Sequence, residues 1–115
     1  MLVQSIAEAQ SALHQASVND QILLLYFTGN FCGPCKQIKP VLESLITKYS
    51  RQLVMYTVDI GTTDLVEHFK IRSIPGFVFF RRNKIIHTQT GADAAALTLA
   101  FELMCNAAYP DLLLL

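Results

Sequence analysis

Two cysteines three positions apart, Cys32 and Cys35, lie where an apolar segment gives way to a segment of helical periodicity. If Cys32 begins the helix, Cys35 follows one turn later on the same face, and the two sulfur atoms can meet. Cys32 would face unpaired N–H groups and the positive end of the helix dipole, which both stabilise a thiolate. Pro34 suits an early helical position, and Gly33 lets a partner backbone approach closely. This pattern predicts an attacking thiol at Cys32 and a shielded resolving thiol at Cys35.

A zinc site is the alternative interpretation of the pair. Zinc usually takes two further ligands from a second close pair. The remaining candidates are scattered along the chain, at Cys105, His14, His68 and His87. A lone C-x-x-C beside a strand–helix–strand pattern is typical of a redox pair, so we expect no metal here.

Apolar periodicity predicts one α/β domain of alternating strands and helices. The continuous apolar run 22–27 is typical of a strand buried on both faces, and a strand over 53–59 should run parallel to it because a helix connects them. The polar segment 81–84 predicts a hairpin turn, and Ser5 and Asp93 are the expected N-caps of the first and last helices. The predicted helices cover 4–16, 35–49, 64–69 and 94–107, and the predicted strands cover 22–27, 53–59, 77–80 and 85–88.

Two features depart from this regular pattern. Pro40 falls inside the helix predicted over 35–49, where a missing donor and a steric clash predict a kink; two separate short helices are the alternative. The apolar tail 109–115 follows the domain expected over 1–108. We expect its four leucines to pack back on the domain or fray, with a docking peptide or dimer contact as the alternative.

Composition excludes several classes of function. The 115 residues are 52% hydrophobic and 16% charged, enough to bury the core of one domain. Nine basic and nine acidic side chains give no electrostatic case for binding nucleic acid or an anionic membrane surface. No secretory signal is visible at residues 1–5, and no apolar stretch approaches the roughly 18 residues of a membrane span. Three cysteines are too few for a disulfide scaffold, so we expect a reducing, cytoplasmic compartment.

The segments 26–36, Pro40, 71–75 and 91–92 resemble the thioredoxin family, in the right order and at the right separations, over about residues 23–107. This resemblance implies a thioredoxin fold, with a mixed sheet of four to five strands flanked by helices. It also implies a thiol–disulfide oxidoreductase that reduces disulfides in partner proteins. By the same resemblance an NADPH-dependent thioredoxin reductase would re-reduce the pair, so this chain would carry no cofactor, and we expect a monomer.

The resemblance further implies that Pro75 is cis and faces Cys32. The N–H and C=O of Ile74 would then be free to hydrogen-bond an extended substrate segment as an added strand. An ordinary turn before a strand is the alternative. Cys32 and Cys35 are the expected catalytic residues. Substrate-binding and site-shaping roles are expected for Phe31, Gly33, Pro34, Ile74, Pro75 and Gly91.

The sequence also departs from the family pattern. Six positions before Cys32 most thioredoxins carry a buried acid that relays the proton of the resolving thiol, whereas this chain has Tyr26, and a phenol is a poor base near neutral pH. We therefore expect slow attack by Cys35, unless Asp59 substitutes; Asp59 otherwise reads as a surface cap. Cys105 is expected to be a buried small hydrophobe rather than a regulatory or dimer-forming thiol. The alternative function is a thioredoxin-fold binding or regulatory module with weak redox turnover, and a dedicated reductant for one enzyme is a third hypothesis.

Overall fold

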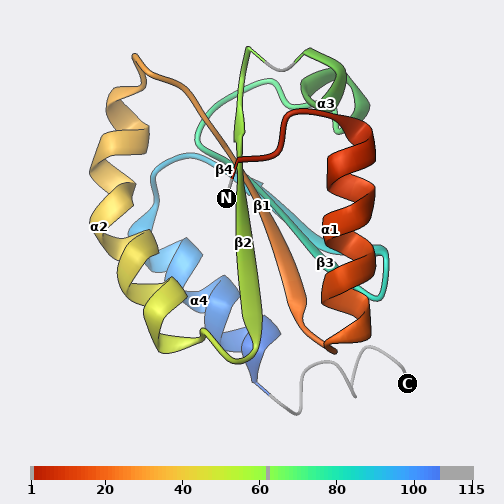
Figure 1. The fold of residues 1–115 in the computed structure, drawn as a ribbon. Helices are drawn as coiled ribbons and strands as arrows, with labels where there is room; N and C mark the ends of the chain where they lie inside the picture. Colours follow the sequence, from red (N-terminus) through yellow and green to blue (C-terminus); the bar gives the residue numbers. More distant parts are fainter. Residues whose placement is uncertain (1, 62, 107–115) are drawn as a thin grey trace.

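Helices and strands alternate from the first helix to the third strand, and a fourth strand and a last helix follow, along residues 2–61 and 63–106, the part of the chain that this computed structural model describes. Figure 1 shows the strands in a central sheet with helices on both sides. The helices are α1 (Ile6–Val18), α2 (Gly33–Lys48), α3 (Thr63–His68) and α4 (Ala94–Cys105). The strands are β1 (Ile22–Thr28), β2 (Leu53–Asp59), β3 (Gly76–Arg81) and β4 (Lys84–Thr90).

The sheet is mixed, with the strand order β2-β1-β3-β4. β1 pairs with β2 in parallel and with β3 antiparallel, and β3 pairs with β4 antiparallel. Leu2 adds a single parallel bridge to Thr57 on the outer side of β2. The predicted mixed sheet and the parallel pairing of its first two strands are confirmed. β1 lies in the interior of the sheet because its apolar run can be covered on both faces.

Each face of the sheet has its own core. As Figure 1 shows, α2 and α4 cover one face, and α1 and α3 cover the other. Alternate side chains of β1 point to opposite faces, so Leu24 and Tyr26 pack with α2 and α4, while Leu25 and Phe27 pack with α1 and α3. The β1 strand therefore belongs to both cores and carries the chain directly to Cys32.

The first helix begins with a reciprocal cap. The Ser5 hydroxyl accepts a hydrogen bond from the Glu8 N–H at 3.1 Å, and the Glu8 carboxylate accepts one from the Gln4 N–H at 2.8 Å. This nearly reproduces the predicted capping box, with the carboxylate bonded one position before the N-cap. The helix ends at Val18 rather than at Ala16, two residues beyond the predicted end.

Pro40 lies inside α2, which is continuous from Gly33 to Lys48. The alternative of two separate short helices is therefore wrong, while the kink stays a prediction. The apolar stripe of α2 buries Ile38 and Leu42 against the sheet. Those contacts hold the helix in place although Pro40 cannot donate a backbone hydrogen bond.

The β3–β4 hairpin turns at Arg82 and Asn83, whose φ angles of 51° and 67° are both positive. Two central residues with positive φ are the signature of a type I′ turn, whose twist matches that of the flanking strands. The hairpin predicted around this polar segment is confirmed.

α4 is the last helix of the described residues. The last helix has Asp93 as its N-cap, as predicted, and it ends at Cys105. The apolar tail at 109–115 and the predicted domain end at residue 108 lie outside the described residues. Over residues 2–61 and 63–106, no helix is long and apolar enough to cross a membrane.

Candidate active site

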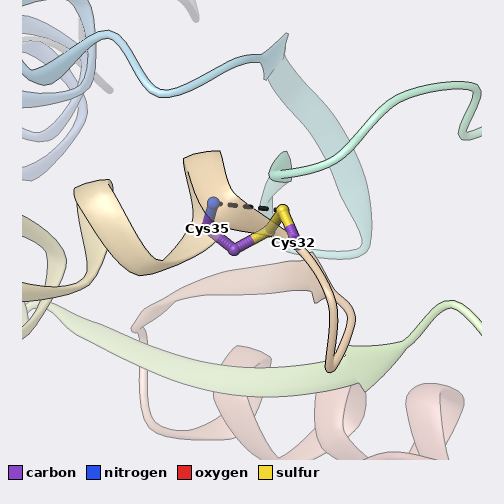
Figure 2. Close-up of a disulfide and its surroundings, with 2 residues drawn as sticks. All are labelled: Cys32 and Cys35. Atoms are coloured by element: carbon purple, nitrogen blue, oxygen red, sulfur yellow. Dashed lines mark hydrogen bonds between the residues drawn. A yellow bond between two sulfur atoms is a disulfide. The ribbon is translucent and has the colours of Figure 1, made fainter.

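Cys32 caps the N-terminus of α2 directly after the loop that follows β1. Its Sγ atom accepts a hydrogen bond from the Cys35 N–H at 3.0 Å, drawn as the dashed line in Figure 2. A disulfide joins the two cysteines, whose Cα atoms are 5.2 Å apart. Only 5% of Cys32 and 4% of Cys35 is exposed. A sulfur that accepts a helix N-terminal N–H is placed where the helix dipole and the unpaired donors favour a thiolate.

The residues around the pair leave one side of it open. Phe31 is fully exposed, with a relative accessibility of 101%. Gly33 begins α2, and a Cβ atom placed there would meet no atom within 4 Å. Pro34 occupies the first turn of the helix, where its missing N–H leaves no bond unmade. The surface is therefore open at Gly33, although Cys32 itself is buried.

A second loop reaches the same end of the sheet. Phe27, near the end of β1, pairs with Gly76 at the start of β3, so the preceding Ile74–Pro75 bond lies near the loop that leads to Cys32. That bond is cis, as the resemblance implied. The Gly91 N–H donates to the Pro75 carbonyl at 2.8 Å. Within 2–61 and 63–106, the N–H and C=O of Ile74 make no hydrogen bond.

Gly29 lets the two loops pack closely. A Cβ atom placed there would lie 3.2 Å from the side chains of both Ile60 and Ile74. Ile60 follows β2, and 44% of its surface is exposed. Sequence reasoning missed Ile60, because no local motif marks it; only the parallel pairing of β1 and β2 brings its loop beside the loop that leads to Cys32.

Cys35 lines a pocket of about 390 Å³, which we call the Cys35 pocket. Tyr26, in place of the acid usual in the family, lines it and stacks on Phe77 with ring centroids 5.3 Å apart. Glu43 also lines the pocket, and it balances part of the positive charge of Lys39, because its Oε1 atom lies 4.0 Å from Lys39 Nζ. The lining residues are Tyr26, Thr28, Gly29, Asn30, Cys35, Lys36, Lys39, Leu42, Glu43, Met55 and Thr57.

Asp59 is not part of this pocket. Its Oδ1 atom accepts a hydrogen bond from the Gly61 N–H at 2.7 Å, which fixes the turn after β2. The structure therefore gives Asp59 the expected capping role in the turn after β2. The sequence pattern that would have pointed to the pocket is Cys35, Lys39 and Glu43, spaced four residues apart on one helix face.

Cys105 is a free and buried thiol on α4, with 7% of its surface exposed. Burial raises the pKa of this thiol from 9.0 to about 12, because the thiolate would lose its hydration. The expectation of a buried small hydrophobe is confirmed. Among the described residues, no group of three or more His, Cys, Asp or Glu side chains could hold a metal ion.

The family model described as Thioredoxin matches residues 5–102. The chain belongs to the thioredoxin family. It is 39% identical over 83 residues to Thioredoxin-1 of Drosophila yakuba, an alignment that covers 71% of this chain and 78% of the fly protein. It is 32% identical over 93 residues to the thioredoxin of Mus musculus, covering 80% of this chain and 86% of the mouse protein.

Solved thioredoxin structures share the fold. The germline-specific thioredoxin Deadhead of Drosophila melanogaster superposes with a TM-score of 0.77 at 33% identity, covering 87% of this chain and 94% of the fly chain. A poplar thioredoxin h superposes with a TM-score of 0.84 at 26% identity, covering 92% of this chain and 96% of the poplar chain. The predicted thioredoxin fold is confirmed.

Family membership and the joined Cys32–Cys35 pair together establish the chemistry. The chain is a thiol–disulfide oxidoreductase of the thioredoxin family and acts on disulfides of proteins. These relatives do not favour the alternative of a binding module with weak redox turnover.

Proposed function

We propose that Cys32 is the attacking thiol and Cys35 the resolving thiol of this oxidoreductase. The observation that carries the assignment is the hydrogen bond from the Cys35 N–H to Cys32 Sγ at the N-terminus of α2. This donor and the helix dipole stabilise negative charge on Cys32 in preference to Cys35, which lies one turn inside the helix. The better-stabilised thiolate forms first and attacks first.

The reaction then proceeds by two exchanges. The Cys32 thiolate attacks one sulfur of a substrate disulfide, forming a mixed disulfide and expelling the other substrate sulfur as a thiolate. The Cys35 thiolate next attacks Cys32 Sγ, which releases the second substrate sulfur and closes the Cys32–Cys35 bond. The substrate gains two electrons, and the cysteine pair loses them.

The substrate segment binds in extended form against Ile74 and Pro75. The N–H and C=O of Ile74, which make no hydrogen bond to any described residue, support this role, because they can pair with a backbone as an added strand would. Gly91 holds the Pro75 carbonyl, and the open surface beside Gly33 leaves room for the substrate chain. The exposed ring of Phe31 supplies an apolar rim.

The partner that restores the dithiol is an NADPH-dependent thioredoxin reductase, which carries the flavin and the nicotinamide, and the protein works as a monomer in the cytoplasm. One observation supports the location: Cys105 is a free thiol within the described chain, which is typical of a reducing compartment. Cell redox homeostasis and electron transport to reductive enzymes are the processes that such a reductant serves.

NADPH-coupled reduction of a generic protein disulfide, such as that of insulin, tests the assignment. With a thioredoxin reductase present, consumption of NADPH is followed by absorbance. We expect Cys32→Ser to abolish turnover, because no attacking thiolate remains. We expect Cys35→Ser to trap the substrate on Cys32 as a covalent adduct that mass spectrometry detects, because the second exchange cannot occur.

A trapped adduct on Cys35 in the Cys32→Ser protein, at the rate of the wild-type reaction, would reverse the two roles. Loss of NADPH consumption with every reductase tested, while a chemical dithiol still supports turnover, would contradict the proposed reductase partner alone. Cys105→Ser is the matched control, and it should turn over like the wild type because that thiol is buried on α4.

A further inference from the structure

The resolving thiol needs a route for its proton, and this chain lacks the buried acid that most of its family uses. Cys35 is only 4% exposed, but it lines the Cys35 pocket, whose volume of about 390 Å³ admits water-sized molecules. The structure places Tyr26, packed flat against Phe77, where that acid would be. The proton of Cys35 must therefore leave by another path.

The charged groups that line the Cys35 pocket come from one element. Asp59, at the end of β2, lies outside this lining, and its Oδ1 atom accepts a hydrogen bond from the Gly61 N–H. β1 contributes Tyr26 to the lining, and β2 contributes only the uncharged residues Met55 and Thr57. All the formal charges of the lining lie on α2, and they are the cations of two lysines and one carboxylate. These residues are Lys36, Lys39 and Glu43.

Helix geometry assigns the two lysines to different thiols. Lys39 is four residues after Cys35, so the bases of the two side chains lie about 5 to 6 Å apart on one face of α2. Lys36 is four residues after Cys32, and its N–H donates to the Cys32 carbonyl at 3.2 Å. Glu43 continues the Cys35 face, with its Oε1 at 4.0 Å from Lys39 Nζ.

We infer that Lys39, whose charge Glu43 balances only in part, stabilises the Cys35 thiolate, so that the Cys35 proton passes through the pocket to solvent and not to a carboxylate of the protein. This inference rests on the roles proposed above for Cys32 and Cys35. In the step, the Cys35 S–H bond breaks and a solvent base takes the proton. The thiolate pair then forms the Cys35–Cys32 bond, and the bond from Cys32 to the substrate breaks with its electron pair on the substrate sulfur.

The effect of Lys39 is modest because 69% of its side chain is exposed to solvent. At the spacing of one helical turn, a single charge in a largely aqueous surrounding is worth about half a pH unit, or roughly threefold in the thiolate population at neutral pH. Lys39 thus acts through its charge on the Cys35 thiolate and is not a catalytic residue.

Rapid mixing of the reduced protein with dithiodipyridine isolates the resolving step. This reagent is uncharged, so Lys39 does not attract it. Attack by Cys32 releases one thiopyridone at a rate proportional to reagent concentration, and attack by Cys35 releases the second at a rate independent of it. Absorbance follows both phases across a pH series, which suits a chain with no tryptophan.

We expect Lys39→Gln to slow the concentration-independent phase about threefold near neutral pH and to raise the midpoint of its pH profile by about half a unit. Lys39→Arg should restore the wild-type profile, because the charge is kept. Added salt should shrink the difference between Lys39→Gln and wild type. Lys48→Gln, on the same helix but outside the pocket lining, is the matched control and should match wild type.

Glu43→Gln separates this inference from its rival, in which Glu43 takes the proton. We expect resolution in Glu43→Gln to be at least as fast as in wild type, because the counter-charge of Lys39 is removed. An unchanged pH profile in Lys39→Gln, or a slowed resolving phase in Glu43→Gln, would overturn the role of Lys39. Absence of a concentration-independent phase in the wild type would instead overturn the proposed roles of Cys32 and Cys35.

Discussion

Gly91 is a single residue on which the geometry of the second loop depends. Its φ of 95° lies in a region that side chains with a Cβ atom rarely adopt, and its N–H holds the Pro75 carbonyl at 2.8 Å. No atom lies within 4 Å of a Cβ placed at this position, so space is not the constraint. The backbone conformation alone requires glycine here.

Replacing Gly91 with alanine is expected to destabilise the protein by about 1 to 2 kcal/mol, the usual cost of positive φ with a Cβ atom. Urea unfolding measures this change. Gly33→Ala is the matched control, because its Cβ also meets no atom but its φ is not positive, so it should be neutral or slightly stabilising. Equal stability of the two variants would refute the conformational argument.

Cys105 makes the stability of the domain depend on alkaline pH. Burial raises its folded-state pKa from 9.0 to about 12, so above about pH 9 the unfolded chain loses a proton that the folded chain keeps. Stability should therefore fall as the pH rises through this window, by about 1.4 kcal/mol per pH unit at most. Urea unfolding at about pH 8 and about pH 10 measures the slope.

The decisive comparison uses Cys105→Ala, because this variant removes the Cys105 thiol alone. The free energy of unfolding of this variant should fall less steeply with pH than that of wild type above about pH 9, because the thiol with the raised pKa is gone. A parallel pair of pH profiles would show that Cys105 does not contribute to the slope.

At the scale of the element, two helices end in the same way without glycine. After α1, Gln21 N–H bonds to the Ala16 carbonyl at 2.8 Å and Asp20 N–H bonds to the Ser17 carbonyl at 3.1 Å. After α3, Ile71 and Lys70 repeat this pair of bonds, at 2.9 and 3.1 Å. Both ends are Schellman motifs, and the residues with positive φ are Asp20 and Lys70, each at 54°.

Lys70→Gly is therefore expected to stabilise the protein, by about 0.5 to 1 kcal/mol, because glycine adopts positive φ without the steric cost that lysine bears. Asp20 is a poorer choice because its carboxylate lies 3.2 Å from the Arg81 guanidinium. Chemical denaturation gives the difference. Lys48→Gly inside α2 should have the opposite sign, with a loss of up to about 1 kcal/mol. A loss in both variants would count against the Schellman assignment.

These helix ends explain which boundaries the sequence could predict. β1 and β2 follow from apolar runs, and the predicted bounds of β2 equal the observed ones. The end of α1 was placed two residues too early because the usual signal, glycine at the residue after the cap, is replaced by Asp20. The motif holds there through tertiary support that no local pattern reveals, including the contact of Asp20 with Arg81.

At the candidate site, too, local patterns predict some features, and others depend on tertiary contacts. Cys32 and Cys35 could be assigned from local spacing, because the cap of a helix depends on neighbouring residues alone. The cis state of Pro75 came from family resemblance and not from spacing. Ile60 and the Cys35 pocket needed the pairing of β1 with β2, which brings together residues that are remote in the sequence.

On the scale of the whole molecule, one sheet connects two cores that do not touch each other directly. β1 sends side chains into both, so neither core can lose its packing without exposing the face of a strand that the other core uses. We expect the domain to unfold in one cooperative transition.

Leu97 on α4 and Leu65 on α3 test this, because each is fully buried and each belongs to a different core. Truncation of either to alanine should cost roughly 2 to 5 kcal/mol and leave the urea m-value unchanged. Circular dichroism and tyrosine fluorescence should give coincident curves. Two separated transitions in either variant would show that the cores unfold independently.

The position of Cys32 at the cap of α2 determines what a partner can sense. The two cysteine Cα atoms are 5.2 Å apart, close to the about 5 Å between Cα atoms three residues apart in a helix. Opening the bond between them therefore requires no displacement of the backbone. We therefore expect the two oxidation states to have nearly one shape and to differ by a charge at the tip of a helix, so that a partner would distinguish them by charge and not by conformation.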